Sequence, residues 1–376
     1  MNIIVTTHDS LQPILGGGGT RTLKTAEEFV RRGHEVIIVA PADDAAKING
    51  IPAESLAAPR KQRSQILSSI KFNVRLCKKI ISHAGWADVV FVHNTIAAAI
   101  VPFLRKWYRF KFSLDITDIH SEYILMGERT AAEKFLTSAL LYFEYWIIRE
   151  ADSITVATNC FKELLVSKGV AAGKIEVVYD GAELDRISSA KGQDYFFNII
   201  HLGLVDKQHG VDVLIRSLHD VLREFPQVRC YIVGDGRELP RVKKLALELG
   251  VIESCIFTGQ LDCQSARRYL EDVGIGIIPR RDSLPNRVVT TLKLLEYWAS
   301  STCVISSKLA GIAEIGNDNE DIIFFEPGNH NELSLKILAM LRSPERVASL
   351  RANGFNRAQD FRWDDLVTRI ADKALE

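Results

Sequence analysis

The sequence predicts an α/β protein of two doubly wound lobes, each built on a parallel sheet with helices on both faces. Two observations carry this prediction. Apolar, β-rich runs alternate with helical patterns along the chain, and the alternation stops once at a polar stretch and then restarts. The length of 376 residues and the hydrophobic content of 47% are also sufficient for two separate cores.

Strands of the first lobe are expected where apolar residues follow one another without polar alternation, as in strands buried on both faces of a parallel sheet. Helical patterns lie between these runs. An apolar stripe from Leu23 to Val30, for example, predicts a helix over Thr22–Arg32 that ends at Gly33. The predicted strands are Ile3–Thr7, Glu35–Ala40, Val89–His93, Phe112–Ile116, Ser153–Ala157 and Ile175–Val178.

The polar stretch Ser188–Asp194 is interpreted as the linker, which places the lobes at residues 1–187 and 188–360 and a last helical segment at 361–376. The predicted strands of the second lobe are Asn198–Leu202, Cys230–Val233, Ile256–Thr258, Ile275–Ile278, Thr302–Ser306 and Ile322–Phe325. Its predicted helices are Val211–Glu224, Leu239–Leu249, Ser265–Glu271, Thr290–Ala299, Glu332–Leu341 and Pro344–Phe361. Since ligands bind beyond the carboxyl ends of parallel strands, we expect the site in a cleft where the two Rossmann-like lobes face each other.

Composition narrows the functional classes. The formal net charge is zero, so no nucleic-acid partner is expected, and the six cysteines include no Cys-x-x-Cys pair that would indicate a zinc site. We predict no metal and no cofactor, and a reducing, cytoplasmic location. The first residues are typical of a strand and not of a signal peptide, and the apolar stretch Val89–Leu104 falls short of the roughly 20 residues that span a bilayer.

Four consecutive glycines, Gly16–Gly19, precede Thr20 and Arg21 at the predicted start of a helix. Glycines let the backbone approach a ligand closely, and a helix N-terminus favours an anion. We therefore favour a ligand-binding loop, with Gly17, Gly18 and Arg21 as contacts, over a flexible surface loop. A dinucleotide-binding loop is disfavoured, because the glycines come eight residues after the strand ends and not in a tight strand-to-helix turn.

The segment Gly203–Gly210 lies between the first strand and the first helix of the second lobe, where a phosphate-binding loop is expected. Gly203, Lys207 and His209 are its candidate contacts to a diphosphate. A solvated lysine and a structural histidine remain the alternative. Gly234 follows the next strand in Gly234-Asp235-Gly236, and it fits a ligand contact or a turn that needs positive φ.

A third candidate segment runs from Arg280 to Glu296, where a polar loop with Arg280 and Arg281 leads into a helix near Thr290. Amides at this helix N-terminus can bind a phosphate. Lys293 and Glu296 share a helix face, and a solvated ion pair between them is the alternative. The neighbouring residues are largely apolar, so the carboxylate is expected to be buried and to need a partner such as the hydroxyls of a ribose.

Taken together, these segments resemble the family 4 retaining glycosyltransferases of the GT-B fold over nearly the whole chain. Each segment is weak by itself, but their order and spacing are specific. The similar segments are Gly16–Gly19, Arg32–Val36, Glu150–Ser153, Val178–Glu183, Val233–Gly236, Phe257–Gly259 and Lys293–Ala299.

The resemblance implies a nucleoside-diphosphate sugar donor, retention at the anomeric carbon and no required metal. It implies that Glu296 binds the donor ribose and that amides near Thr291 and Leu292 hold the diphosphate. Gln260 and Leu261 would border the base. Asp118 and His120 would lie near the reacting sugar, and the last segment, 361–376, would cross back onto the first lobe.

Two features depart from the family pattern, at three positions. Leu204 and His209 stand where the family commonly has an arginine and a lysine, and Val288 stands where it often has a first glutamate. We expect front-face displacement in which Lys207, His209, Lys293, one or both of Arg280 and Arg281, and helix amides stabilise the leaving diphosphate in place of a metal.

The predicted function is transfer of a sugar to an acceptor in cell-surface glycan or glycolipid assembly. A sugar-nucleotide epimerase or hydrolase on the same fold, and an inactive protein that binds nucleotide sugars, remain alternatives. A nicotinamide-dependent oxidoreductase is disfavoured by the glycine spacing.

Residues 55–114 contain eleven Lys and Arg but a single acidic residue, Asp88. Within them, residues 60–81 and 105–112 interleave basic and apolar side chains. Such a mixture fits an interfacial helix on an anionic membrane surface, at the inner face of the membrane, with a lipid-linked acceptor. An ordinary solvated helix face is the alternative.

Overall fold

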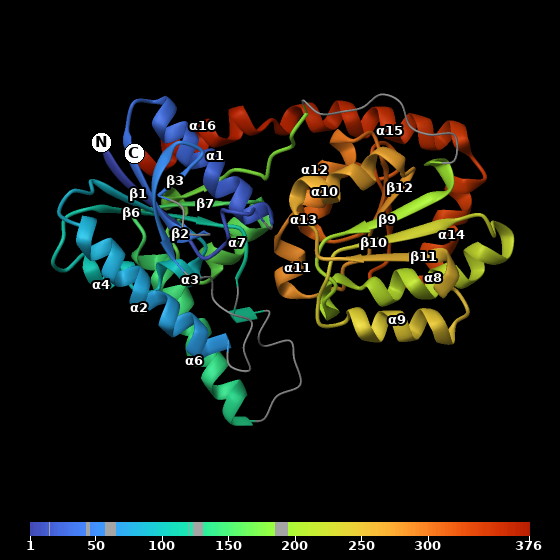
Figure 1. Ribbon diagram of the computed structural model, residues 1–376, viewed down its shortest axis with the longest axis horizontal. Helices are drawn as coiled ribbons and strands as arrows, with labels where there is room; N and C mark the ends of the chain where they lie inside the picture. The colour runs from blue at the N-terminus through green and yellow to red at the C-terminus, as the bar shows by residue number, and fades with distance from the viewer. Residues whose placement is uncertain (15, 43–45, 57–64, 120, 123–130, 185–194) are drawn as a thin grey trace. The chain divides into compact units, whose positions relative to one another are not determined.

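The computed structural model describes residues 1–14, 16–42, 46–56, 65–119, 121–122, 131–184 and 195–376, with the backbone alone at 65–69 and 131–134. The chain divides into two compact units. Unit 1 is Met1–Tyr179 with Asp364–Glu376, and unit 2 is Asp180–Trp363 (Figure 1). The predicted linker, Ser188–Asp194, lies outside the described residues.

Unit 1 contains a sheet in the order β3-β4-β2-β1-β5-β6-β7-β8, parallel except where β3 pairs with β4. Helices lie on both faces of it (Figure 1). The strands are β1 (Asn2–Thr7), β2 (Glu35–Pro41), β3 (Lys47–Ile48), β4 (Ile51–Leu56), β5 (Val89–His93), β6 (Lys111–Ile116), β7 (Ser153–Val156) and β8 (Ile175–Val177). The helices are α1 (Gly17–Arg31), α2 (Gln65–His83), α3 (Thr95–Ala98), α4 (Val101–Leu104), α6 (Ala131–Glu150), α7 (Asn159–Ser167) and α16 (Trp363–Leu375), whose residues from Asp364 onward belong to this unit.

Unit 2 contains a sheet in the order β11-β10-β9-β12-β13-β14, with every described pairing parallel. Its strands are β9 (Asn198–Leu202), β10 (Arg229–Val233), β11 (Cys255–Gly259), β12 (Ile275–Ile278), β13 (Cys303–Ser307) and β14 (Ile323–Phe325). Its helices are α8 (Val211–Glu224), α9 (Leu239–Glu248), α10 (Cys263–Arg268), α11 (Leu284–Val288), α12 (Leu292–Ala299), α13 (Ala310–Ala313), α14 (His330–Leu341) and α15 (Pro344–Ala358). The predicted fold class, two doubly wound α/β lobes, is confirmed.

Both sheets reverse their strand order once, between β1 and β5 in unit 1 and between β9 and β12 in unit 2. At such a switch point the two neighbouring strands send their connections to opposite faces, which opens a crevice at the carboxyl ends. The topology therefore points to the ends of β1 and β5, and of β9 and β12, as the places for ligands.

Two local predictions are wrong. The first helix begins at Gly17 and not at Thr22, because Gly16 serves as an extended N-cap and the next glycines form the first turn. Part of the predicted polar loop Arg280–Arg287 is the short helix α11, capped by Ser283, whose side chain accepts from the Asn286 amide. Strand β4, next to the edge strand β3, was not predicted, because Pro52 and Glu54 interrupt its apolar run.

Helix α12 is fastened to the sheet of unit 2 by two aromatic side chains. The Tyr297 ring packs on Gly276 of β12, where a Cβ would overlap it, and the Tyr297 hydroxyl accepts from the Leu202 amide at 2.9 Å. The Trp298 indole donates to the Asp321 carbonyl at 2.9 Å. These contacts fix the helix that carries Lys293 and Glu296 beside the ends of β9 and β12.

The last helix, α16, buries its apolar side chains, among them Leu366, Ile370 and Ala374, and two ion pairs of its polar side chains also hold it to unit 1. Arg369 forms an ion pair with Glu176 at 3.0 Å, and Arg32 forms one with Asp372 at 2.7 Å. Among the described helices none is long and apolar enough to span a bilayer.

Candidate functional site

Three turns pack closely at the carboxyl ends of the unit 2 strands, and glycines in two of them allow the close contact. Gly203, Gly210 and Gly234 all have positive φ. A Cβ at Gly234 would overlap the Gly203 carbonyl, and a Cβ at Gly210 would overlap the Pro279 carbonyl. The turn after β9 is therefore held between the turns after β10 and β12. For Gly234, this close backbone contact favours the turn interpretation over a ligand contact.

Lys293 reaches this turn from the first residues of α12. Its Nζ lies 3.4 Å from the position that a Cβ on Gly203 would take, and the residue is only 9% exposed. Among the described residues, no hydrogen-bond partner reaches Nζ. Burial, and then the charge of Arg280, lowers the pKa of Lys293 to about 7, while Glu296 acts in the opposite direction.

Three more basic side chains lie near Lys293. Nε of Arg280 and Nδ1 of His209 are buried with no hydrogen-bond partner within the described structure. The His201 ring is also buried, beside the backbone of Leu204 and Ile277. Burial, and then the charge of Lys293, holds the pKa of both histidines well below the usual range, so both rings are neutral near pH 7. We call Lys293, Arg280, His201 and His209 the basic cluster. Buried donors of this kind call for an anionic partner.

Glu296 already has a protein partner. Nε of Arg267, from α10, donates to Glu296 Oε1 at 3.1 Å, and Nη1 of Arg267 donates to Glu183 Oε2 at 2.7 Å. Burial raises the pKa of Glu296, and Arg267 opposes this. Sequence reasoning missed Arg267, which lies 29 positions from Glu296, and no local signal connects the two.

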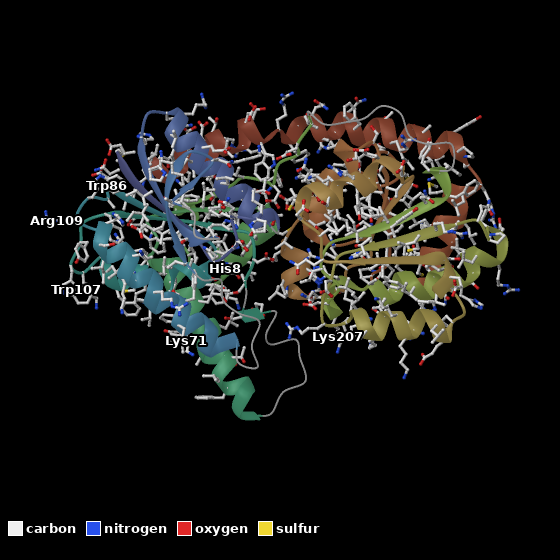
Figure 2. The ribbon with its side chains drawn as sticks, viewed as in Figure 1. His8, Lys71, Trp86, Trp107, Arg109 and Lys207 are labelled. Carbon is white, nitrogen blue, oxygen red and sulfur yellow. The ribbon has the colours of Figure 1, made fainter. Side chains whose placement is uncertain are left out.

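The other predicted residues of unit 2 lie on several different elements of the unit. Thr291 is the N-cap of α12 and Leu292 its first residue. Arg281 donates to Asp212 Oδ2 at 2.5 Å, and Lys207 is exposed on the surface of the unit (Figure 2). Gln260 and Leu261 follow β11, the edge strand, which is two strands away from β9.

In unit 1, the prediction that the Arg21 side chain contacts substrate is wrong. The side chain is completely buried, and Nε and Nη2 donate to the two oxygens of Asp115, each at 2.8 Å. Nη1 and Nη2 also donate to the carbonyls of Tyr179 and Val178. Burial alone would raise the pKa of Asp115, but Arg21 and His93 hold it well below its usual range. Arg21 is therefore the counter-ion of a buried carboxylate.

His93 connects this ion pair to the glycine turn. Its Nδ1 lies 2.7 Å from Asp115 Oδ2, and its Nε2 lies 3.8 Å from Asp9 Oδ2. A Cβ at Gly18 would overlap both Asp9 and His93, so Gly18 lets α1 begin directly above them. Sequence reasoning missed His93 and Asp115. Their signal was the polar end of two buried strands, because His93 and Asp115 are register partners on β5 and β6.

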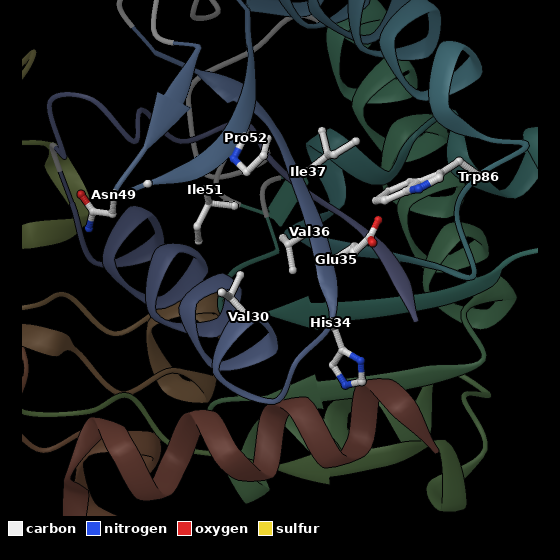
Figure 3. A pocket seen from close by; sticks show the side chains of 10 residues that line it. Val30, His34, Glu35, Val36, Ile37, Asn49, Ile51, Pro52 and Trp86 are labelled. Carbon is white, nitrogen blue, oxygen red and sulfur yellow. The ribbon is translucent and has the colours of Figure 1, made fainter.

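Asp118 lies just after β6 and is half-buried, and His120 lies outside the described residues. A cavity of about 650 Å³ elsewhere in unit 1 is lined by none of the predicted site residues. Glu35, Val36 and Trp86 line it near the amino end of β2, together with Ile51 and Pro52 (Figure 3). That is the end of the sheet opposite to the one that binds ligands in doubly wound folds.

The basic and apolar stretch 60–81 is only partly described, since residues 60–64 and the side chains of 65–69 are not. Phe72, Leu76 and Ile80 of α2 are buried, as are Phe110 and Phe112, and belong to the core of unit 1. The exposed apolar side chains are Ile70, Val74, Ile81 and, at 72% exposed, Trp107. Lys71 and Arg75 lie exposed on the same helix, and Figure 2 marks Lys71, Trp107 and Arg109.

Two family models match the chain. Residues 16–181 match a glycosyl transferase 4-like domain, and residues 197–343 match glycosyl transferases group 1. Two uncharacterised glycosyltransferases of Methanocaldococcus jannaschii are similar, one at 24% identity over 61% of each chain and one at 23% over 89% of this chain and 87% of its own. An alpha-monoglucosyldiacylglycerol synthase of Streptococcus pneumoniae is 22% identical over 98% of this chain and 87% of its own.

Solved structures share the fold. A sucrose-phosphate synthase from Thermosynechococcus elongatus superposes with a TM-score of 0.82 at 17% identity, over 99% of this chain and 98% of its own. HepE of Anabaena, in complex with UDP and glucose, superposes with a TM-score of 0.79 at 16% identity over both whole chains. The resemblance found in the sequence is thereby confirmed, and the chain belongs to the family 4, group 1 glycosyltransferases of the GT-B fold.

Proposed function

We propose that this glycosyltransferase takes its sugar from a nucleoside-diphosphate sugar, retains the anomeric configuration and needs no metal. The observation that carries the proposal is the basic cluster of unit 2, beside the switch point of the sheet. There, Lys293 Nζ, Arg280 Nε and His209 Nδ1 are buried with no hydrogen-bond partner among the residues that the structure describes. A diphosphate supplies the anionic oxygens that such donors need. The complex of HepE with UDP and glucose, on the same fold, supports this choice of ligand.

Within the proposed site, Lys293 and Arg280 take the place of the cations that Leu204 and His209 do not supply. The N-terminal amides of α12, near Thr291 and Leu292, add donors to the same diphosphate. Lys207 is exposed, so we assign it a weaker role at the rim. Glu296, held by Arg267, is assigned to the ribose, with Gln260 and Leu261 bordering the base.

The proposed chemistry is front-face displacement. The leaving diphosphate gathers negative charge as the glycosidic bond breaks, and preorganised cationic and amide donors stabilise that charge without a metal. Loss of one such donor typically costs on the order of 3 kcal/mol in a transition state. Asp118, just after β6, is assigned to the reacting sugar.

We further propose a lipid-linked acceptor at an anionic membrane surface, as part of cell-surface glycan or glycolipid assembly. Ile70 and Val74 lie exposed beside Lys71 and Arg75 on α2, and Trp107 is also exposed, a mixture typical of interfacial surfaces. The relative named for a glycolipid product supports this acceptor class. Co-sedimentation with vesicles should increase with their content of anionic lipid and fall for Lys71→Glu with Arg75→Glu. Binding that ignores vesicle charge would refute this part.

The test of the donor is a panel of sugar nucleotides, with an acceptor panel and with EDTA. Transfer should persist in EDTA, and proton NMR of the product should show the donor's anomeric configuration. Consumption of donor without acceptor would instead favour an epimerase or hydrolase. Binding of donor that is never consumed would favour an inactive nucleotide-sugar-binding protein.

A further inference from the structure

The basic cluster is crowded with nitrogens and poor in carboxylates. Nζ of Lys293 is buried 3.4 Å from the position that a Cβ on Gly203 would take, and no described residue gives it a hydrogen-bond partner. The charged and titratable groups coupled to it are Arg280 in the turn after β12, His201 on β9, His209 in the turn after β9 and Glu296 on its own helix. Glu296 is the single carboxylate in this set, and Arg267 already pairs with it while also pairing with Glu183. Little negative charge is left to balance a protonated Lys293.

Within this cluster, only some groups can lose a proton. Arginine side chains do not lose their proton in proteins, whereas a lysine amine and a histidine imidazole can be neutral. Charge repulsion in the empty site is therefore relieved at Lys293 and the histidines. This leaves Arg280 as the permanent cation that attracts the first anion.

Resting on the proposed function, we propose that the site binds the diphosphate of its donor together with a proton, which the Lys293 amine takes from solvent on binding and returns when the nucleoside diphosphate leaves. The step is a protonation of the Nζ lone pair, with no change in the ligand. A diphosphate brings two negative charges beside Nζ, and an opposite charge within about 4–6 Å favours the charged form of an amine. The same oxygens also fill the hydrogen-bond vacancies of the buried amine.

The number of protons taken up on binding follows from the pKa of Lys293 in the ligand-free protein. For one amine with a pKa of about 7, the uptake on binding is about 0.9 proton at pH 8, about 0.5 at pH 7 and about 0.1 at pH 6. Because the ligand binds the protonated form, affinity weakens as pH rises above the pKa of the free site. The dissociation constant should rise about tenfold per pH unit above pH 8.

The experiment is calorimetric titration of the full chain with UDP-glucose, and separately with GDP-mannose, at pH 6, 7 and 8, each time in two buffers that titrate near that pH and differ in ionisation enthalpy. Their diphosphate diesters do not titrate over this range, so protons exchanged with the buffer report on the protein. The expected result is an uptake that increases with pH as given above. Uptake near zero at all three values, or uptake that is largest at pH 6, would overturn the proposal.

Two variants assign the proton. Lys293→Arg keeps a permanent charge and should bind with an uptake below about 0.2 proton at pH 8, because arginine does not titrate there. Lys244→Arg, on the exposed face of α9, is the matched control and should keep the wild-type uptake. If Lys293→Arg also keeps the wild-type proton uptake, Lys293 is not the group that takes up the proton, and the proposal is wrong.

The outcomes also separate this inference from the function on which it rests. Binding of either donor without proton uptake would leave the donor assignment intact and refute only the proton coupling. Absence of binding by every nucleotide sugar in the panel would refute the donor assignment itself. If Lys293→Arg fails to fold, Lys293→Met offers a neutral side chain of similar length, and it should bind more weakly and without uptake.

Discussion

Replacing Lys293 with methionine should make the free protein more stable. In the folded chain burial lowers the pKa of this amine to about 7, against 10.5 for the unperturbed side chain. At about 1.4 kcal/mol per pH unit, this interval corresponds to about 5 kcal/mol at or below pH 7. Lys293→Met removes that cost and keeps an unbranched side chain, so we expect a gain in unfolding free energy on the order of 3–5 kcal/mol at pH 7.

The sign of the pH dependence is part of this prediction. Between pH 7 and about 10.5 the unfolded chain binds a proton at this lysine that the folded chain does not, so the wild-type unfolding free energy rises with pH. Lys293→Met lacks this slope. Its advantage should therefore shrink from its value at pH 7 to about 2 kcal/mol at pH 9.

The assay is urea unfolding at pH 7 and pH 9, followed by circular dichroism and tryptophan fluorescence. Lys244→Met, at an exposed position of α9, is the control and should change stability by less than about 0.5 kcal/mol at either pH. A Lys293→Met protein that is less stable than wild type at pH 7 would refute the reasoning, as would a gain that is the same at both pH values. Donor binding by the same variant should be weaker, because the site loses a cation.

Three further predictions concern residues that the sequence alone did not assign. Asp115→Asn should lower the free energy of unfolding by about 3–5 kcal/mol at pH 7, because Arg21 is left buried without its counter-ion. The ionised Asp115 stabilises the fold above its unfolded pKa, and this stabilisation is lost as pH falls. The midpoint temperature of thermal unfolding should therefore fall more steeply for the wild type than for the variant below pH 4. Arg267→Ala should lower kcat/KM for the donor by about tenfold or more, because it removes the ion pair that orients Glu296; unchanged donor kinetics would contradict that role. Gly210→Ala should lower the free energy of unfolding by about 1–3 kcal/mol, because Gly210 has a positive φ and the added Cβ would overlap the Pro279 carbonyl. In parallel urea titrations the loss should exceed that of Gly33→Ala, since Gly33 has a positive φ but open space around its Cβ position.

The strands of both units could be predicted closely because each is a short apolar run in a buried parallel sheet. Val89–His93, Asn198–Leu202 and Ile275–Ile278 have the same limits in the sequence prediction and in the structure. Hydrophobic patterning did not predict elements that are buried on one face only or whose start depends on local backbone geometry. Strand β4, next to the edge of the sheet, carries Pro52 and Glu54, and the start of α1 depends on glycines that have no helical signal of their own.

The candidate site was predictable in outline, because the carboxyl ends of the strands carry its residues. Lys293 and Glu296 were expected on one face of a buried helix, and α12 places them there. Their partners were not predictable. Arg267 reaches Glu296 from another helix, and His201 faces Lys293 from the sheet, so neither contact leaves a trace in local sequence.

By itself, the sequence determined the two-lobed α/β fold, the family and the segments from which a site could be built. These follow from hydrophobic periodicity and from the spacing of motifs, which are local properties of the chain. The tertiary structure decided which charges are paired. It buried Arg21 against Asp115, and it left Lys293 Nζ under the Gly203 turn with no hydrogen-bond partner in the described part of the chain. Pairing depends on which strand ends and helix faces meet in space, and that packing determines where an anion is needed.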